Sequence, residues 1–170
     1  MTGKQHAAFA LGITAASAVS STVLYATGHE EVALGVVGGA LTGYILTPDI
    51  DVNTMTYEEA RMYRVFWLLG VVWTSLWTPY ATAFSHRGWS HTPIIGTLTR
   101  LAYILLVSTL IIWISRVPGL NPYALAEYAY YNPTVSISWF LLWACQDIVH
   151  YICDISSTAW KKSQRRKATK

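Results

Sequence analysis

The feature that most restricts the fold of this chain is a set of four long apolar segments separated by polar stretches. They cover residues 7–27, 32–47, 93–115 and 135–156 of the 170-residue sequence. A helix needs about 20 apolar residues to cross the hydrocarbon core of a bilayer, where it satisfies its own backbone groups. Only 12% of the residues are charged, about half of what soluble domains carry. We therefore expect an all-α integral membrane helical bundle with four spans.

A fifth apolar run, residues 65–77, is shorter than a span and rich in tryptophan. Trp67, Trp73 and Trp77 are of the type that gathers at membrane–water interfaces, so we expect an interfacial Trp-rich helix here. If this run crossed the membrane instead, the polar stretches on its two sides would lie on opposite faces. Residues 116–134, which are rich in proline and tyrosine, are expected to form a loop.

Positive charge is concentrated at the C-terminal end, where residues 161–170 hold half of the 12 lysines and arginines. A basic segment beside an apolar helix indicates a cytoplasmic position facing anionic lipid, and nucleic acid is the less favoured partner. We expect a protein of the inner (cytoplasmic) membrane with both termini cytoplasmic and the lipid bilayer as its surroundings.

The aspartates and most histidines lie at the ends of the apolar segments. Asp147, His150 and Asp154 are three and four residues apart and so share one helix face. A carboxylate and an imidazole one turn apart can hold a divalent ion. Asp49 and Asp51, in the sequence Pro-Asp-Ile-Asp, offer oxygen ligands for such an ion.

Structural roles remain open for the same residues. The Pro-Asp-Ile-Asp segment is also a common type of helix-capping turn. Asp147 and Asp154 can instead pair with Arg100 or with lysines of the basic segment.

Residues 86–93, His-Arg-Gly-Trp-Ser-His-Thr-Pro, combine two imidazoles with a guanidinium. Gly88 permits a tight turn that brings His86 and His91 together, and Pro93 is a favourable first helical residue. A helix beginning at Pro93 points its free N–H groups and positive dipole end at this segment. Metal-binding imidazoles beside an anion-binding Arg87 favour a phosphoester site.

Three motifs carry a resemblance to a known family: Thr-Pro-Asp-Ile-Asp-Val-Asn at 47–53, the segment 86–100, and Asp-Ile-Val-His-Tyr-Ile-Cys-Asp at 147–154. From about residue 4 to residue 156 the sequence resembles bacterial and phage metal-binding membrane proteins of unknown function, which are related to membrane-bound metal-dependent hydrolases. Its motif order is similar, more distantly, to zinc-dependent phospholipase C and single-strand nucleases. Those enzymes have two His-x-x-x-Asp pairs. This chain has one, at His150 and Asp154, so one or two metal ions are expected.

The residues and the resemblance together give a set of candidate site residues. The candidate metal ligands are His6, Asp49, His86, His91, His150 and Asp154. Arg87 and Asp51 are assigned to catalysis, with Arg87 holding the anion. Asp147 is expected to orient an imidazole from outside the ligand shell.

The function that these residues predict is a membrane-bound metal-dependent hydrolase with a divalent ion, zinc favoured. It would act on a phosphoester, a lipid headgroup before others, at the cytoplasmic face. Residues 1–160 would form a single membrane-embedded metal-binding domain and residues 161–170 a basic tail. The alternatives are a non-catalytic metal-binding membrane protein, in which the ion joins helix ends, and a small membrane subunit that docks a larger complex. A metal site requires ligand atoms from the three motifs to lie within about 4–5 Å of a common point.

Overall fold

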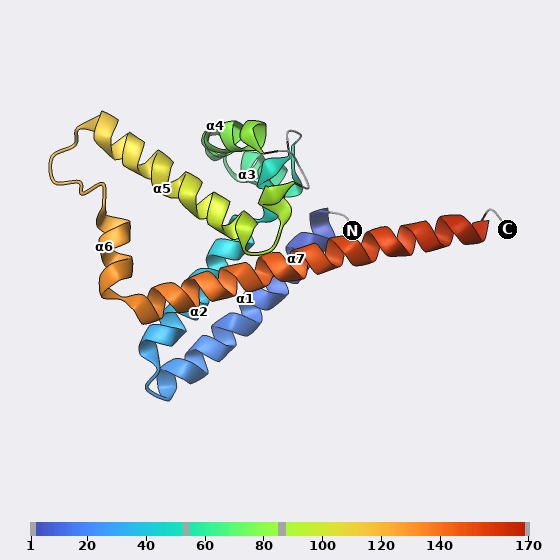
Figure 1. Cartoon of the computed structure of the whole chain (residues 1–170), viewed down its shortest axis with the longest axis horizontal. Helices are drawn as coiled ribbons and strands as arrows, with labels where there is room; N and C mark the ends of the chain where they lie inside the picture. The colour runs from blue at the N-terminus through green and yellow to red at the C-terminus, as the bar shows by residue number, and fades with distance from the viewer. Residues whose placement is uncertain (1–2, 53–54, 85–87, 169–170) are drawn as a thin grey trace.

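The computed structural model of the chain describes residues 3–52, 55–84 and 88–168 (Figure 1). Over these ranges every regular element is helical, which confirms the all-α expectation. The elements are, in chain order, α1 (Gly3–Ala26), α2 (Glu30–Ile45), the 3-10 turn η1 (Pro48–Asp51), α3 (Tyr57–Val65), α4 (Trp67–Ala83), the 3-10 turn η2 (Trp89–His91), α5 (Ile95–Ser115), α6 (Ala124–Tyr131) and α7 (Pro133–Ala168).

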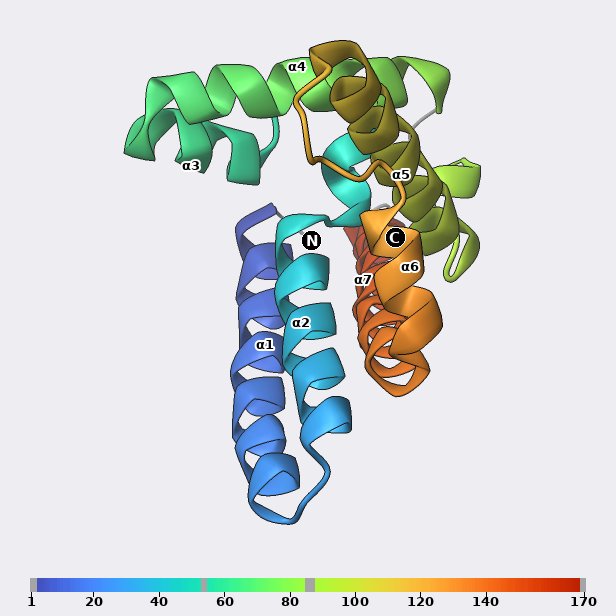
Figure 2. The same ribbon diagram turned by 90° about the vertical axis from the view of Figure 1, so that its left-hand side faces the viewer.

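Three of the long helices, α1, α2 and α7, pack into a bundle. α1 and α2 run side by side in opposite directions (Figure 2), and α7 lies along α2. Gly35 and Gly39 allow this approach, because a Cβ atom at either position would collide with the backbone of α7 near Trp139. The Trp139 indole also donates a hydrogen bond to the Thr42 hydroxyl, at 2.9 Å. Small residues with a few polar links between helices are typical of packing inside a membrane.

A shorter hairpin, α3 and α4, lies across one end of the α1–α2 pair (Figure 2). Thr56 and Glu59 begin α3 with a capping box, in which each side chain bonds the backbone N–H of the other residue. Trp77 and Tyr80 of α4 are buried against Ile50 of η1. The Trp-rich run is therefore helical as expected, but Trp77 is a core residue, whereas Trp67 is 65% exposed. This packing holds η1 at the end of the bundle.

The remaining hairpin diverges from the bundle. α5 begins beside α7, extends away from it, and is joined back to the start of α7 through α6 (Figure 1). The expected loop at 116–134 thus contains a helix of two turns, α6. The last helix, expected at residues 135–156, is also longer, because α7 continues to Ala168. Lysine and arginine are good helix formers, so the charged segment extends α7 without a break.

Four helical segments are long and apolar enough to cross a membrane: Lys4–Ala26, Glu30–Asp51, Ile95–Ser115 and Pro133–Lys167. They correspond to the four segments expected from the sequence. Only 17% of the most apolar window of the first and third segments is buried inside the protein. Their remaining aliphatic surface, which includes Val19 and Ile111 at 68% and 58% exposure, is available to an apolar surrounding.

Candidate metal centre

One end of the bundle collects histidine and aspartate side chains from four elements. His6 lies in the first turns of α1, and His150 lies in the middle of α7, one turn before Asp154. Pro48 cannot continue α2 and holds Thr47 in an extended conformation. The chain therefore turns into η1 at this point and places Asp49 at the end of α2.

The fourth element, η2, reaches the same place from the other half of the fold. A Cβ atom on Gly96, in the first turn of α5, would collide with the carbonyl of Ser90, so glycine lets η2 lie directly on α5. His91, the last residue of η2, is consequently buried. Its ring meets the ring of His150 edge to face, with 5.3 Å between the ring centroids.

The donor atoms of these five residues lie close together. His6 Nε2 is 3.0 Å from Asp154 Oδ1, and His91 Nε2 is 3.3 Å from Asp154 Oδ2. His150 Nε2 lies 3.5 Å from Asp49 Oδ1 and 3.9 Å from Asp154 Oδ2. The donors form two triads that share His150, and within each triad the ligand atoms are within 4.8 Å of one another.

These separations suit a metal ion. Ligands that bind one ion at about 2.0–2.2 Å lie about 3.0–3.6 Å from each other. His150 Nε2 gives an independent test, because it is buried without a hydrogen-bond partner among the described residues. Its nearest carboxylate oxygen, Asp49 Oδ1, is 3.5 Å away, which is long for a hydrogen bond and close to the separation of two ligands of one ion.

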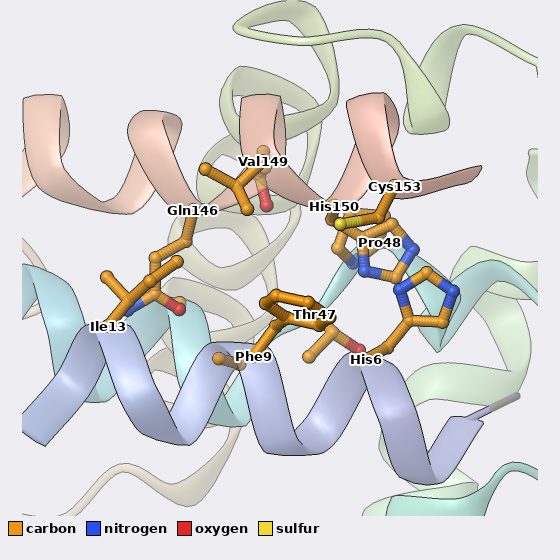
Figure 3. Close-up of a pocket in the computed structure, with 12 residues that line it drawn as sticks. His6, Phe9, Ile13, Thr47, Pro48, Gln146, Val149, His150 and Cys153 are labelled. Carbon is orange, nitrogen blue, oxygen red and sulfur yellow. The ribbon is translucent and has the colours of Figure 1, made fainter. Parts of the chain in front are cut away.

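The two types of donor differ in exposure. The side chains of His6, His91 and His150 are 9%, 5% and 8% exposed, whereas those of Asp49 and Asp154 are 22% and 21% exposed. Figure 3 shows the rings of His6 and His150 face to face between α1 and α7, with 4.2 Å between their centroids. They border a cavity of about 20 Å³ between α1, α2 and α7, which has room for about one water molecule. The imidazoles therefore close the inner side of the centre, and the carboxylates lie nearer to solvent.

Asp51 lies behind His91 and does not reach the surface, since its side chain is 0% exposed. One of its oxygens, Oδ2, accepts a hydrogen bond from the Ser90 hydroxyl at 2.5 Å and lies 3.4 Å from His91 Nδ1. A carboxylate at Nδ1 holds the proton on that nitrogen and leaves Nε2 for a metal. The expected part of Asp51 in catalysis stays a prediction, and its position beside His91 Nδ1 is suited to orienting that imidazole.

The aspartates around His91 shift its pKa. Burial alone would lower its pKa, but the hydrogen bond and the charge of Asp51, followed by the charge of Asp49, outweigh burial. The pKa of His91 is therefore held above its usual value. Without a metal ion, the protonated imidazole balances part of the negative charge that the aspartates place at this centre.

A buried ion pair joins the two halves of the fold beside the centre. Arg100 of α5, at 0% exposure, pairs with Asp147 of α7, whose Oδ2 also accepts a hydrogen bond from Thr97. A second guanidinium nitrogen, Nη1, donates a hydrogen bond to the Ser90 carbonyl at 3.3 Å. The centroid of the Trp143 ring lies 5.7 Å from Arg100 Cζ. Arg100 thus links η2, which carries His91, to the segment of α7 one turn before His150.

Asp147 consequently has a different partner from the expected one. It was assigned to orient an imidazole, whereas the structure shows it bound to Arg100 and Thr97, the pairing that the sequence left open. The sequence reasoning did not identify Thr97 or Ser90. A charged residue such as Arg100 inside an apolar segment needs a buried partner. The position of Arg100 in the sequence could therefore have indicated that buried polar residues surround it.

The other expected residues divide as follows. His6, Asp49, His91, His150 and Asp154 are brought together, whereas His86 and Arg87 lie outside the described residues. The helix expected to begin at Pro93 begins at Ile95, after Ile94 with φ +67° and ψ −55°. Its first amides are not free, because those of Ile95 and Gly96 donate to the carbonyls of Pro93 and Thr92. Those two amides are not available to bind an anion.

The fold and the donor cluster together define an all-α metal-binding protein. The chain matches the family described as "Uncharacterized metal-binding protein (DUF2227)" over residues 1–164, and it belongs to that family. It has no match among curated proteins or solved structures. The expected resemblance to metal-binding proteins of unknown function is confirmed, and its further relation to hydrolases and nucleases stays a prediction.

Proposed function

We propose that this metal-binding protein is a membrane-bound hydrolase that uses a divalent metal ion to cleave a phosphoester. The observation that carries the proposal is the meeting of three imidazoles and two carboxylates, from four elements, at ligand separations. Mixed nitrogen and oxygen donors of this kind suit zinc. Three nearly buried imidazoles beside two partly exposed carboxylates leave one side of the centre open, as a catalytic site requires.

The chemistry follows from the exposed side of the centre. At this centre, a bound ion would lower the pKa of a water molecule towards about 7 and would polarise a phosphoryl oxygen. Asp154 borders an open groove between η2 and α7, so substrate and water would reach the ion on the side of this carboxylate. His91 reaches the same groove and is held in position by Asp51. Arg87 remains the predicted anion-binding residue.

Helix lengths support a location at a membrane face. From Pro133 to His150, α7 rises about 27 Å at 1.5 Å per residue, and α5 is about 31 Å long. Each length is close to the roughly 30 Å of a hydrocarbon core. The centre would then lie at the membrane surface, with the basic end of α7 on the same side. An excess of lysine and arginine favours the cytoplasmic side, where lipid headgroups are the nearest phosphoesters.

Metal content is the first test, measured by elemental analysis of the protein purified in detergent. Wild type should hold at least about one equivalent of divalent metal, and His150→Gln should lose it. His29→Gln is the matched control, because His29 is exposed at the turn between α1 and α2. Equal metal in wild type and His150→Gln would exclude this centre.

Hydrolysis is the second test. Metal-loaded wild type should release nitrophenol from nitrophenyl phosphate, should stop on addition of a chelator, and should recover when metal is restored. Arg87→Lys should keep the metal and lose the activity, because an ammonium lacks the bidentate geometry of a guanidinium. Metal binding without hydrolysis of any phosphoester would instead support the non-catalytic alternative. That alternative is favoured by one observation, that the donors come from four elements and an ion would join their ends.

A further inference from the structure

The open side of the metal centre continues into a groove along α7. The groove has a volume of about 450 Å³ and lies between η2 and α7, within the range of pockets that bind small molecules. His91 and Asp154 border one end of it. On its α7 wall, Thr158 and Lys162 follow Asp154 at one-turn intervals, and Ile155 and Ala159 lie beside them.

The chemistry of this wall changes along its length. Between Asp154 and Lys162, Ile155 and Ala159 offer apolar surface, and the Thr158 hydroxyl lies between these two residues along the helix. The Lys162 ammonium adds a positive charge at the far end. Asp154 and Lys162 are separated by about 12 Å along the helix axis at 1.5 Å per residue. The long lysine side chain can lie along the apolar stretch and shorten that distance.

We propose that the groove selects a ligand with two anionic groups, a phosphoester at the metal centre and a second anionic group at Lys162, joined by an apolar spacer. This inference rests on the proposed function for the role of the first phosphoester. It assigns Lys162 a part in recognition that is separate from the general positive charge of the end of α7. Lys162 is the lysine that lines the groove, and its neighbour Lys161 does not.

The test is binding of alkyl phosphates to zinc-loaded, detergent-solubilised protein, with released phosphate assayed in parallel so that binding constants are taken only where the ligand is intact. Hexanediol bisphosphate should bind about five- to tenfold more tightly than hexyl phosphate, as expected for one added charge-assisted contact at an exposed site. Propanediol bisphosphate, whose shorter spacer carries its second phosphate less far along the groove, should show a smaller gain. Lys162→Met should remove the gain for hexanediol bisphosphate, and Lys161→Met, which removes the same charge one residue away, should keep it.

Three results would overturn the proposal. The first is equal binding of hexanediol bisphosphate and hexyl phosphate to wild type, and the second is the same loss in Lys161→Met as in Lys162→Met. The third result would come from measuring binding to vesicles of phosphatidylcholine with and without phosphatidylglycerol. If Lys162→Met weakens binding to anionic vesicles but not to hexanediol bisphosphate, the lysine recognises a membrane surface and not a group on the ligand.

The outcomes for the groove and for the proposed function are separable. A bisphosphate preference that depends on Lys162, without hydrolysis of nitrophenyl phosphate, supports the groove and removes the hydrolase. Hydrolysis without that preference supports the hydrolase and removes the second anionic subsite.

Discussion

Replacing Arg100 by methionine tests how the two halves of the metal centre are held together. The substitution keeps a long apolar side chain but leaves Asp147, at 3% exposure, without its buried cation. Removing one partner of a buried ion pair costs about 3–5 kcal/mol, because the other charge stays buried and unpaired. The Ser90 carbonyl loses a hydrogen bond as well. For a chain of this size each kcal/mol lowers the melting temperature by about 2–4 °C, so the loss should be about 6–20 °C.

A second variant separates the lost ion pair from lost packing. The double variant Arg100→Met/Asp147→Leu removes both charges. Its free energy of unfolding should return to within about 1–2 kcal/mol of wild type, and the remaining difference reflects the lost hydrogen bond from Thr97. Thermal unfolding in detergent, followed by tryptophan fluorescence, measures both variants. Arg116→Met is the control, since Arg116 is an exposed arginine at the other end of α5. If the double variant is as unstable as Arg100→Met alone, the unpaired carboxylate is not the cause and the reasoning is wrong.

Two further predictions concern His91. Asp51→Asn should weaken metal binding by about 10- to 100-fold, because the amide cannot fix the proton on His91 Nδ1 as a carboxylate does. Competition with a chromogenic chelator measures the metal affinity. An unchanged affinity would show that Asp51 does not support the centre. The raised pKa of His91 also sets a pH dependence: its protonated form stabilises the metal-free protein below its usual value of 6.5, and this contribution is lost as pH rises through the raised pKa. The stability difference between metal-free wild type and His91→Gln should therefore shrink from about pH 6 to about pH 9, while metal affinity of wild type increases because the ion needs a neutral imidazole. A constant difference over that range would contradict the assignment.

The sequence predicted the parts of the centre that follow from helix periodicity and from the cost of charge in apolar segments. His150 and Asp154 share a face because they are four residues apart. Asp49 lies at a helix end because Pro48 must stop the preceding helix. His6 was included through the family resemblance, since a single histidine near the start of an apolar segment has no partner that local sequence can reveal.

The parts that were not predicted depend on contacts between distant elements. Whether Asp147 faces an imidazole or Arg100 is decided by where α5 crosses α7, and both choices satisfy the same spacing on α7. The late start of α5 depends on Ile94 with a positive φ of +67°, which a β-branched residue rarely adopts. No sequence rule for helix starts would choose that residue.

The positions of His6 and Asp154 bear on how the protein is made. The first lies at the start of α1 and the second beyond the middle of α7, yet their side chains are 3.0 Å apart. During synthesis the chain emerges from its N-terminal end, so α1 and α2 can pair long before the last donors exist. The centre can close only after α7 has left the ribosome and docked along α2. Capture of the ion is therefore a late step of assembly, and a nascent chain that stops before α7 lacks two of the five donors.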